Sequence, residues 1–198
     1  MHTIIDKIVS LFLDFFPKNK TDMNPIISKN IRVRHPELFK VGNFSIVDDY
    51  SYFSTGVIVG ECSHIAAGCN VGGGSEFTFR LGDFCSLSSG VKIWCVSNDF
   101  VNDLVTIIPP NCPPISVNPL CGNVTFENYT AAGSNSIIMP DNVIPEGTVI
   151  GALTYIPYRF KMKPWSVYAG SPARLVKDRN KDRILAQIKQ LREFIRSQ

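Results

Sequence analysis

The segment "VGNFSIVDDYSYFSTGVIVGECSHIAAGCNV", residues 41–71, decides the fold, because a large apolar residue returns at every sixth position. Neither a helix nor a simple alternating strand has a period of six, whereas a short strand followed by a tight corner does. Three such edges make one triangular coil, so the segment predicts a parallel β-solenoid. The apolar positions are Val41, Val47, Phe53, Val59, Ile65 and Val71, with Phe77 one step further.

The same repeat extends over most of the chain. After a slip of four residues it resumes at Leu81, Leu87 and Ile93, and after a long interruption at Phe126, Ala132, Ile138, Ile144, Ile150 and Ile156. Small residues stand four places after many of these positions, as side chains beside a corner should: Ser45, Ser51, Ser63, Cys69, Ser75, Cys85, Thr130, Ser136, Thr148 and Thr154. A β-sandwich fits less well, since its turns return about every 8–12 residues.

The repeat block ends in "PWSVYAGSPARLVK", residues 164–177. With this Ser-Pro-Ala-Arg turn, the sequence resembles the left-handed parallel β-helix acyltransferases, the hexapeptide-repeat family. The resemblance covers residues 41–177, and residues 126–156 match the last coils of that family, including Pro140. Ala132 departs from the pattern, because a larger aliphatic residue is usual there, and it implies a small void or a shifted coil.

The two ends of the chain have helical patterns. We expect residues 1–40 to form an N-terminal helix and lead-in, 41–177 the left-handed β-helix, and 178–198 a C-terminal helix. The first helix carries charges within its apolar run, which favours a docking helix over a membrane span and leaves a membrane-surface helix as the alternative. The second places Ile184, Ile188, Leu191 and Ile195 on one face, as for capping the solenoid or contacting a trimer partner.

Composition excludes several classes of function. The net charge of +3 is too small, and the basic residues too scattered, to indicate nucleic-acid binding. Six cysteines without a Cys-x-x-Cys pair and without a secretory leader indicate reduced, structural thiols, no metal and a cytoplasmic protein.

Two interruptions break the repeat, residues 72–80 and residues 96–123. A loop of more than about 15 residues within a compact domain is usually functional or disordered. Five prolines stiffen the second interruption, so we expect an ordered arm. The resemblance implies that this arm reaches over an active site shared with the next subunit of a homotrimer.

The resemblance also implies acyl transfer from an acyl-coenzyme A, usually acetyl, to a hydroxyl or an amine. In the O-acetyltransferase branch a histidine follows an asparagine at the start of the arm, as general base. Here Asn98 is followed by Asp99. A hydroxyl must lose its proton as it attacks, whereas a neutral amine attacks unaided and releases the proton afterwards. Asp99 therefore favours an amine acceptor, with Asn98 as a hydrogen-bond partner of the substrate.

Two alternatives remain for each candidate catalytic residue. Asp99 suits catalysis if burial raises its pKa or a histidine completes a relay, and otherwise it is a turn residue whose carboxylate binds its own backbone. His64 closes a hexad, which predicts an outward position at a corner, either catalytic or at an ordinary surface.

Coenzyme contacts follow from the resemblance alone. It places them along the last coils and the Pro-Ala turn, with Arg174 and Lys177 meeting phosphate. A backbone N–H near Gly133 or Gly151 is a candidate oxyanion donor. The full set is Gly133, Ser134, Gly151, Ala152, Ser171, Pro172, Ala173, Arg174 and Lys177.

The string "SNDFVNDLVT", residues 97–106, is most similar to sugar-modifying members of the family. We therefore expect an acetyl-coenzyme A-dependent N-acetyltransferase for a nucleotide-linked amino-deoxysugar, in bacterial cell-surface polysaccharide (O-antigen) biosynthesis. The first alternative is an O-acetyltransferase of a polysaccharide or lipid-linked sugar, with His64 as base. The second is a non-catalytic scaffold.

Overall fold

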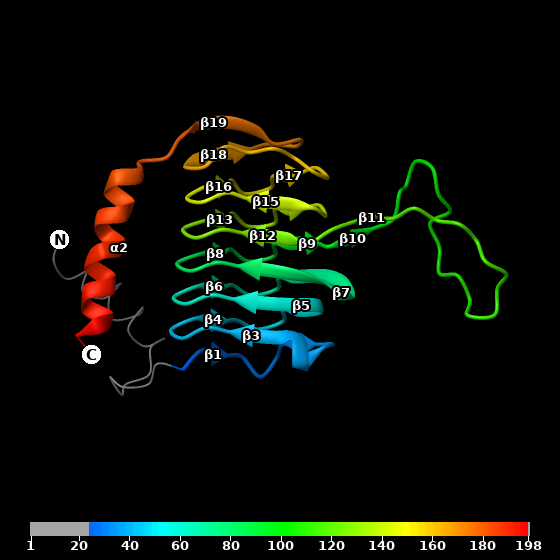
Figure 1. Ribbon diagram of the computed structural model, residues 1–198, viewed down its shortest axis with the longest axis horizontal. Coiled ribbons are helices and arrows are strands. Elements are labelled where there is room, and N and C mark those ends of the chain that lie inside the picture. The colour runs from blue at the N-terminus through cyan, green and yellow to red at the C-terminus, as the bar shows by residue number, and fades with distance from the viewer. Residues whose placement is uncertain (1–23, 198) are drawn as a thin grey trace. The chain divides into compact units, whose positions relative to one another are not determined.

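Residues 24–197 are described in the computed structural model, and they contain a parallel β-solenoid followed by one α-helix (Figure 1). The described chain divides into the solenoid unit, Pro25–Lys181, and a unit to which residues from Asp182 onward belong. The solenoid confirms the predicted fold class, a left-handed parallel β-helix. The predicted N-terminal helix falls within residues 1–23, outside the described residues.

The solenoid has three faces, which the chain visits in the order A, B, C. Face A holds β1 (Ile26–Ile27), β4 (Ile46–Val47), β6 (His64–Ile65), β8 (Ser86–Leu87), β13 (Ala131–Ala132), β16 (Val149–Ile150) and β18 (Ser166–Ala169), with β19 (Arg174–Asp178) antiparallel at its end. Face B holds β2 (Arg32–Val33), the first residues of β5 (Tyr52–Val59) and β7 (Asn70–Leu81), β9 (Lys92–Trp94), β14 (Ile137–Ile138) and β17 (Tyr155–Ile156). Face C holds β3 (Phe39–Val41), the last residues of β5 and β7, β12 (Val124–Phe126) and β15 (Asn142–Ile144).

The three edges between these faces carry the corners of each coil. The AB edge lies between faces A and B, the BC edge between B and C, and the CA edge between C and A. In the first coil the 3-10 helix η1 (Pro36–Leu38) forms the corner at the BC edge. One coil lies directly above the next, because the parallel strands stay in register along each face, as Ile46, His64 and Ser86 do on face A.

The core consists of the inward apolar residues that the six-residue period predicts. Phe53, Ile65 and Ile138 are fully buried, as are their equivalents in the other coils. Phe77 is an exception, since Phe79 takes the inward position opposite Val57. The insertion at residues 72–77 lengthens β7 and shifts its register, which displaces the count by two positions.

Small hydroxyl residues near the corners tie neighbouring coils together. Ser45 Oγ donates to Gly60 O at 2.7 Å, and Ser63 Oγ donates to Gly82 O at 2.7 Å. These side chains are buried, and every buried polar side-chain atom among the described residues has a partner. The predicted interval of four is thereby confirmed as a structural feature, except that Ser75 is exposed in the insertion.

Two local expectations are refined by the structure. Ala132 keeps its register with Leu87 below and with Ile150 above, so the coil is not shifted. The solenoid also begins earlier than the regular count, because β1 and β2 already pair in parallel with β4 and β5.

The C-terminal helix is confirmed as α2 (Lys181–Arg196). It forms part of the second compact unit, and its predicted role as a cap or a trimer contact stays a prediction. Within the described part of the chain, no helix has the length and apolar character that a membrane crossing requires.

Candidate active site

The long interruption is an ordered arm that leaves the solenoid at the BC edge (Figure 1). Its base is a two-stranded antiparallel ribbon of β10 (Val96–Ser97) and β11 (Leu120–Cys121). The ribbon is fixed to the coils, because Cys95 N donates to Gly72 O at 2.6 Å and Gly122 N donates to Cys95 O at 3.0 Å. The arm therefore projects from a rigid base, immediately after the last inward residue of β9.

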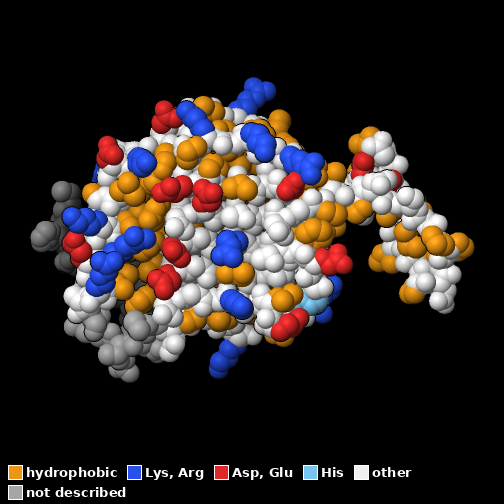
Figure 2. All heavy atoms as spheres, in the orientation of Figure 1, with side chains coloured by type: hydrophobic (Ala, Val, Ile, Leu, Met, Phe, Trp, Pro, Cys, Tyr) orange, Lys and Arg blue, Asp and Glu red, His pale blue; other side chains and the backbone are white. Residues whose placement is uncertain are grey.

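Apolar side chains of the arm lie in solvent. Figure 2 shows hydrophobic side chains along the projecting segment. The exposed fraction reaches 89% at Val101 and 90% at Ile107. Clustered exposed apolar side chains are typical of surfaces that contact another surface.

Asp99 lies at the root of the arm with its carboxylate in a local turn. Oδ1 accepts from Val101 N at 2.9 Å and from Asn102 N at 3.2 Å, while Oδ2 accepts from Asn102 Nδ2 at 2.7 Å. The Asn102 amide, and then the Val101 N–H, hold the pKa of Asp99 below its ordinary value. The condition of a pKa raised by burial is therefore not met within one chain. Asn98 is exposed beside it, and its carbonyl accepts from Ser97 Oγ at 3.3 Å.

His64 lies elsewhere in the solenoid. It is on the flat outer side of face A, in β6, rather than at a corner. Its Nε2 contacts Asp48 Oδ2 at 2.8 Å. Because Asp99 sits on the arm at the edge between the other two faces, one chain does not bring His64 and Asp99 together. The sequence interpretation missed Asp48 as the partner of His64.

Four of the expected coenzyme contacts do come together on the AB edge. Gly133 and Ser134 occupy this edge in one coil, and Gly151 and Ala152 occupy it in the next. Gly133 N donates to Ile150 O at 2.8 Å, and Gly151 N donates to Tyr168 O at 2.8 Å. Since both N–H groups are used between coils, the structure does not support either as an oxyanion donor.

The Pro-Ala turn completes this edge. Ser171 and Pro172 are exposed, whereas Ala173 is buried and its N–H donates to Tyr155 O at 2.9 Å. Arg174 and Lys177 are exposed on β19, and among the described residues neither takes part in an ion pair. Arg174 follows the turn at this edge, opposite Ala169, whereas Lys177 lies further along face A, opposite Val167. An edge of small residues with a cation at its end fits a long coenzyme with phosphate at one end.

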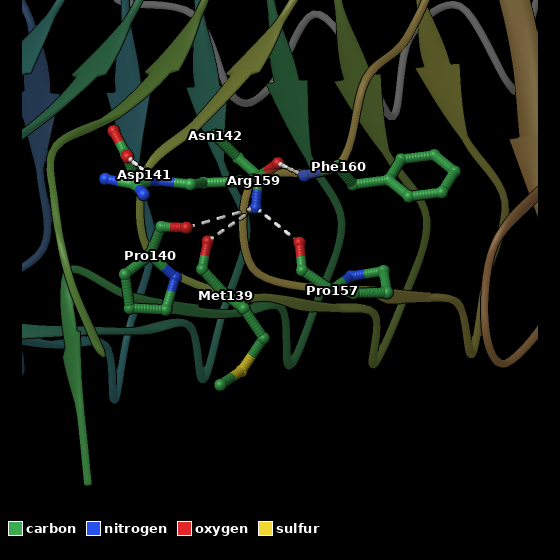
Figure 3. Close-up of polar contacts among 7 residues, drawn as sticks. All are labelled: Met139, Pro140, Asp141, Asn142, Pro157, Arg159 and Phe160. Atoms are coloured by element: carbon green, nitrogen blue, oxygen red, sulfur yellow. Dashed lines mark hydrogen bonds and ion pairs between the residues drawn. The ribbon is translucent and has the colours of Figure 1, made fainter. Parts of the chain in front are cut away.

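A buried asparagine braces the BC edge just above the arm (Figure 3). Asn142 Nδ2 donates to the carbonyls of Met139 and Pro157 at 2.9 and 2.8 Å, and to that of Pro140 at 3.3 Å. Its Oδ1 accepts from Phe160 N at 2.8 Å. All four groups belong to the BC-edge corners of two successive coils, so Asn142 holds these corners together. An asparagine at an inward position between apolar residues was the available sequence signal.

A shallow groove of about 410 Å³ crosses face C. Arg80 lines it, but so do three acidic residues, Asp83, Glu127 and Glu146. Two of these carboxylates accept from backbone N–H groups, Asp83 from Glu61 N and Glu127 from Glu146 N. The groove therefore suits an anionic substrate poorly.

The other candidate reactive groups are structural. All six cysteines are free thiols, and burial raises the pKa of Cys69 and of Cys95 to about 11. Thiols with such a pKa are poor nucleophiles at neutral pH. Within residues 24–197, no group of three histidine, cysteine, aspartate or glutamate side chains is placed to hold a metal ion.

Similarity to characterised proteins bears on the function of this site. No protein-family model matches the chain. The chain is 25% identical over 164 residues to dTDP-4-amino-4,6-dideoxy-D-glucose acyltransferase of Escherichia coli, a match that covers 78% of this chain and 82% of that protein. A probable macrolide acetyltransferase of Lysinibacillus sphaericus is 30% identical over 111 residues, or 52% of this chain and 61% of that protein.

A solved structure gives a longer match. A mutant of AntD, an N-acyltransferase from Bacillus cereus, superposes with a TM-score of 0.76 at 28% identity, covering 86% of this chain and 88% of that one. That structure is a complex with dTDP-4-amino-4,6-dideoxyglucose and coenzyme A. These relatives are enzymes, which disfavours the non-catalytic scaffold. Together with the solenoid and its arm, they show an acyltransferase that resembles the hexapeptide-repeat N-acyltransferases of nucleotide-linked amino sugars.

Proposed function

We propose that the protein is an acetyl-coenzyme A-dependent N-acetyltransferase that acts on a nucleotide-linked amino-deoxysugar. The observation that carries the proposal is the similarity, over 86% of the chain, to an N-acyltransferase in complex with such a sugar and coenzyme A. The Escherichia coli relative is named for the same amino sugar. The proposal includes a role in cell-surface polysaccharide (O-antigen) biosynthesis and a cytoplasmic location.

The carboxylate at the arm root supports an amine acceptor. The turn around Asp99 keeps its carboxylate ionised and partly exposed. In the proposed reaction the neutral sugar amine attacks the thioester carbonyl, and the proton of the resulting ammonium passes to Asp99 or to water. The C–S bond then breaks and the thiolate leaves. A weak base suffices because the proton moves after the attack.

The proposal includes a homotrimer, in which the arm of one subunit covers the site of the next. Its support is the exposed apolar surface of the arm, which no core among residues 24–197 buries. The coenzyme lies along the AB edge, with its phosphate on Arg174 and Lys177. Asn98, exposed next to Asp99, is the proposed hydrogen-bond partner of the sugar.

The test compares an amine with a hydroxyl acceptor. Purified protein is given acetyl-coenzyme A with dTDP-4-amino-4,6-dideoxyglucose or with its 4-hydroxy counterpart, and thiol release is followed. We expect turnover with the amine only. Asp99→Asn should lower kcat, whereas His64→Ala should leave kcat and KM unchanged. Turnover of the hydroxyl sugar alone would reject the proposal.

One observation favours a second candidate, sugar O-acetylation. His64 Nε2 is 2.8 Å from Asp48 Oδ2, the pairing that orients a histidine as general base. If this dyad is the base, His64→Ala and Asp48→Asn should each abolish transfer to a hydroxyl acceptor. Asp99→Asn should then have little effect.

A further inference from the structure

Two arginines share one aromatic ring on the outer side of face B. The guanidinium carbon of Arg32 lies 5.6 Å from the ring centroid of Tyr52, and that of Arg34 lies 5.7 Å from it. Arg32 is directly opposite Tyr52 in the β2–β5 ladder, and Arg34 follows two residues later on the same side. Each arginine is exposed. We call Arg32 and Arg34, held on the ring of Tyr52, the arginine pair.

The arginine pair has no anionic partner among the described residues. Among residues 24–197, ion pairs involve His35, His64, Arg159 and Lys163 but neither of these arginines. Attraction to the ring face holds each guanidinium in place, although the two positive charges repel one another. An anion between them offsets this repulsion. Because the forks are already oriented, little side-chain freedom is lost when they bind it.

An exposed indole lies on the same face, nearer the arm. Trp94 ends β9 opposite Gly72 and is 36% exposed. A Cβ on Gly72 would come within 2.8 Å of Trp94 Cζ3 and 3.5 Å of Ser54 Oγ. The ring therefore extends from β9 across Gly72 toward β5, in the direction of the arginine pair. Only glycine at position 72 leaves room for it.

The spacing along face B suits a nucleotide. Neighbouring parallel strands are about 4.8 Å apart, so the indole above Gly72 lies roughly 10 Å from the backbone of β2. Arginine side chains that lean toward Tyr52 shorten this separation to about the distance between the base and the phosphates of a nucleotide. Planar bases stack on indole rings, and paired guanidinium forks bind phosphate oxygens.

We propose that Arg32, Arg34 and Trp94 bind the nucleoside diphosphate part of the acceptor, with the arginines on the diphosphate and the base on the indole. The identity of the ligand rests on the proposed function. Trp94 stands five residues before Asp99, at the base of the arm. Because the sugar is attached to the diphosphate, it lies on the arginine side of this site, where the arm of a neighbouring subunit in the proposed homotrimer would reach it.

Binding of dTDP alone tests the proposal without any catalysis. Calorimetric titration of dTDP and, separately, of coenzyme A compares the wild type with the Arg32→Ala/Arg34→Ala double variant. Lys40→Ala is the matched control, because Lys40 is an exposed cation of the same coil on face C. We expect the double variant to weaken dTDP binding at least about 10-fold, since charge-assisted contacts are lost, and to leave coenzyme A binding unchanged. The control should bind both as the wild type does.

Fluorescence tests the indole. The chain has two tryptophans, Trp94 and Trp165, and stacking of the base should quench the emission of Trp94. The quench on adding dTDP should persist in Trp165→Phe and disappear in Trp94→Phe. An unchanged Kd for dTDP in the double variant, or a loss of coenzyme A binding instead, overturns the proposal.

These outcomes are separable from the failure of the proposed function. If dTDP binding is lost in the double variant but the wild type transfers no acetyl group to the amino sugar, the nucleotide site stands and the proposed reaction fails. If the wild type transfers acetyl and the double variant keeps its KM for the amino sugar, the reaction stands and the nucleotide site fails.

Discussion

The coils and the arm use similar apolar residues in opposite ways. Ile138 in a coil is fully buried, whereas Ile107 in the arm is 90% exposed. The coils pair strand to strand along three faces, while the arm has only its short basal ribbon and a few turns. The coils thus contain their own core, and the arm's apolar side chains lack one in the part of the chain that the structure describes. The stability of the fold resides in the first region and the proposed chemistry at the root of the second.

Removing the arm should have the largest effect on the difference between the two regions. Replacing residues 99–118 with a short Gly-Ser linker leaves the β10–β11 ribbon and deletes Asp99. We expect transfer to fall roughly 10²–10⁴-fold, the usual contribution of a positioned acid or base. The solenoid should unfold at the same denaturant concentration as before. Thiol release and urea denaturation measure the two effects, and retention of full activity would contradict the assignment of the site to the arm.

A matched pair of truncations compares the two regions directly. Ile138→Ala leaves a cavity in the core and should lower the free energy of unfolding by about 2–5 kcal/mol. Ile107→Ala removes exposed surface and should change it by less than about 0.5 kcal/mol. Urea denaturation at one protein concentration measures both. Equal losses would mean that the arm folds as part of the core.

The asparagine at the BC edge above the arm gives a smaller effect. Asn142→Asp replaces the Nδ2 donor by an oxygen that faces three carbonyls (Figure 3). Leaving buried polar groups unpaired costs about 1–3 kcal/mol, so a loss of this size is expected. Asn135→Asp, at an exposed corner, is the control and should stay within about 0.5 kcal/mol of the wild type. A loss as large in the control would show a general effect of added charge.

The period of six made the coils predictable from sequence, because each inward residue must meet its equivalents in the neighbouring coils. In the two interruptions of the repeat, where this constraint is absent, the positions of side chains were predicted less well. The prediction that Phe77 points into the core was wrong, because the insertion at residues 72–77 moves Phe79 into that position. The arm's position followed from the break in the period, but the turn that holds the Asp99 carboxylate did not.

Contacts that depend on side-chain stacking could not be predicted from the sequence either. Arg32 and Arg34 precede the regular count, and nothing in their spacing places them on Tyr52. The same holds for the contact of His64 with Asp48, 16 residues earlier. Gly133 and Gly151 show the converse: the count placed them on one edge, while only the structure shows that their N–H groups are already used.

The smallest effect concerns the protonation of Asp99. The Asn102 amide and the Val101 N–H stabilise the carboxylate and hold its pKa below the ordinary value. A lowered pKa in the folded state means that Asp99 favours folding above its unfolded pKa, and that this contribution is lost as pH falls through the folded pKa. Because the group is solvent-exposed, the effect on stability is small, and the pKa itself is the better observable.

Asn102→Ala removes the largest cause of the lowered pKa, so the Asp99 pKa, followed by carboxyl NMR, should rise toward its ordinary value. The acid limb of the pH–rate profile should move to higher pH as well, since the ionised carboxylate accepts the amine proton. Asn118→Ala, which leaves these contacts in place, should change neither, and an Asp99 pKa that is the same in both variants would mean that Asn102 does not set the charge at the arm root.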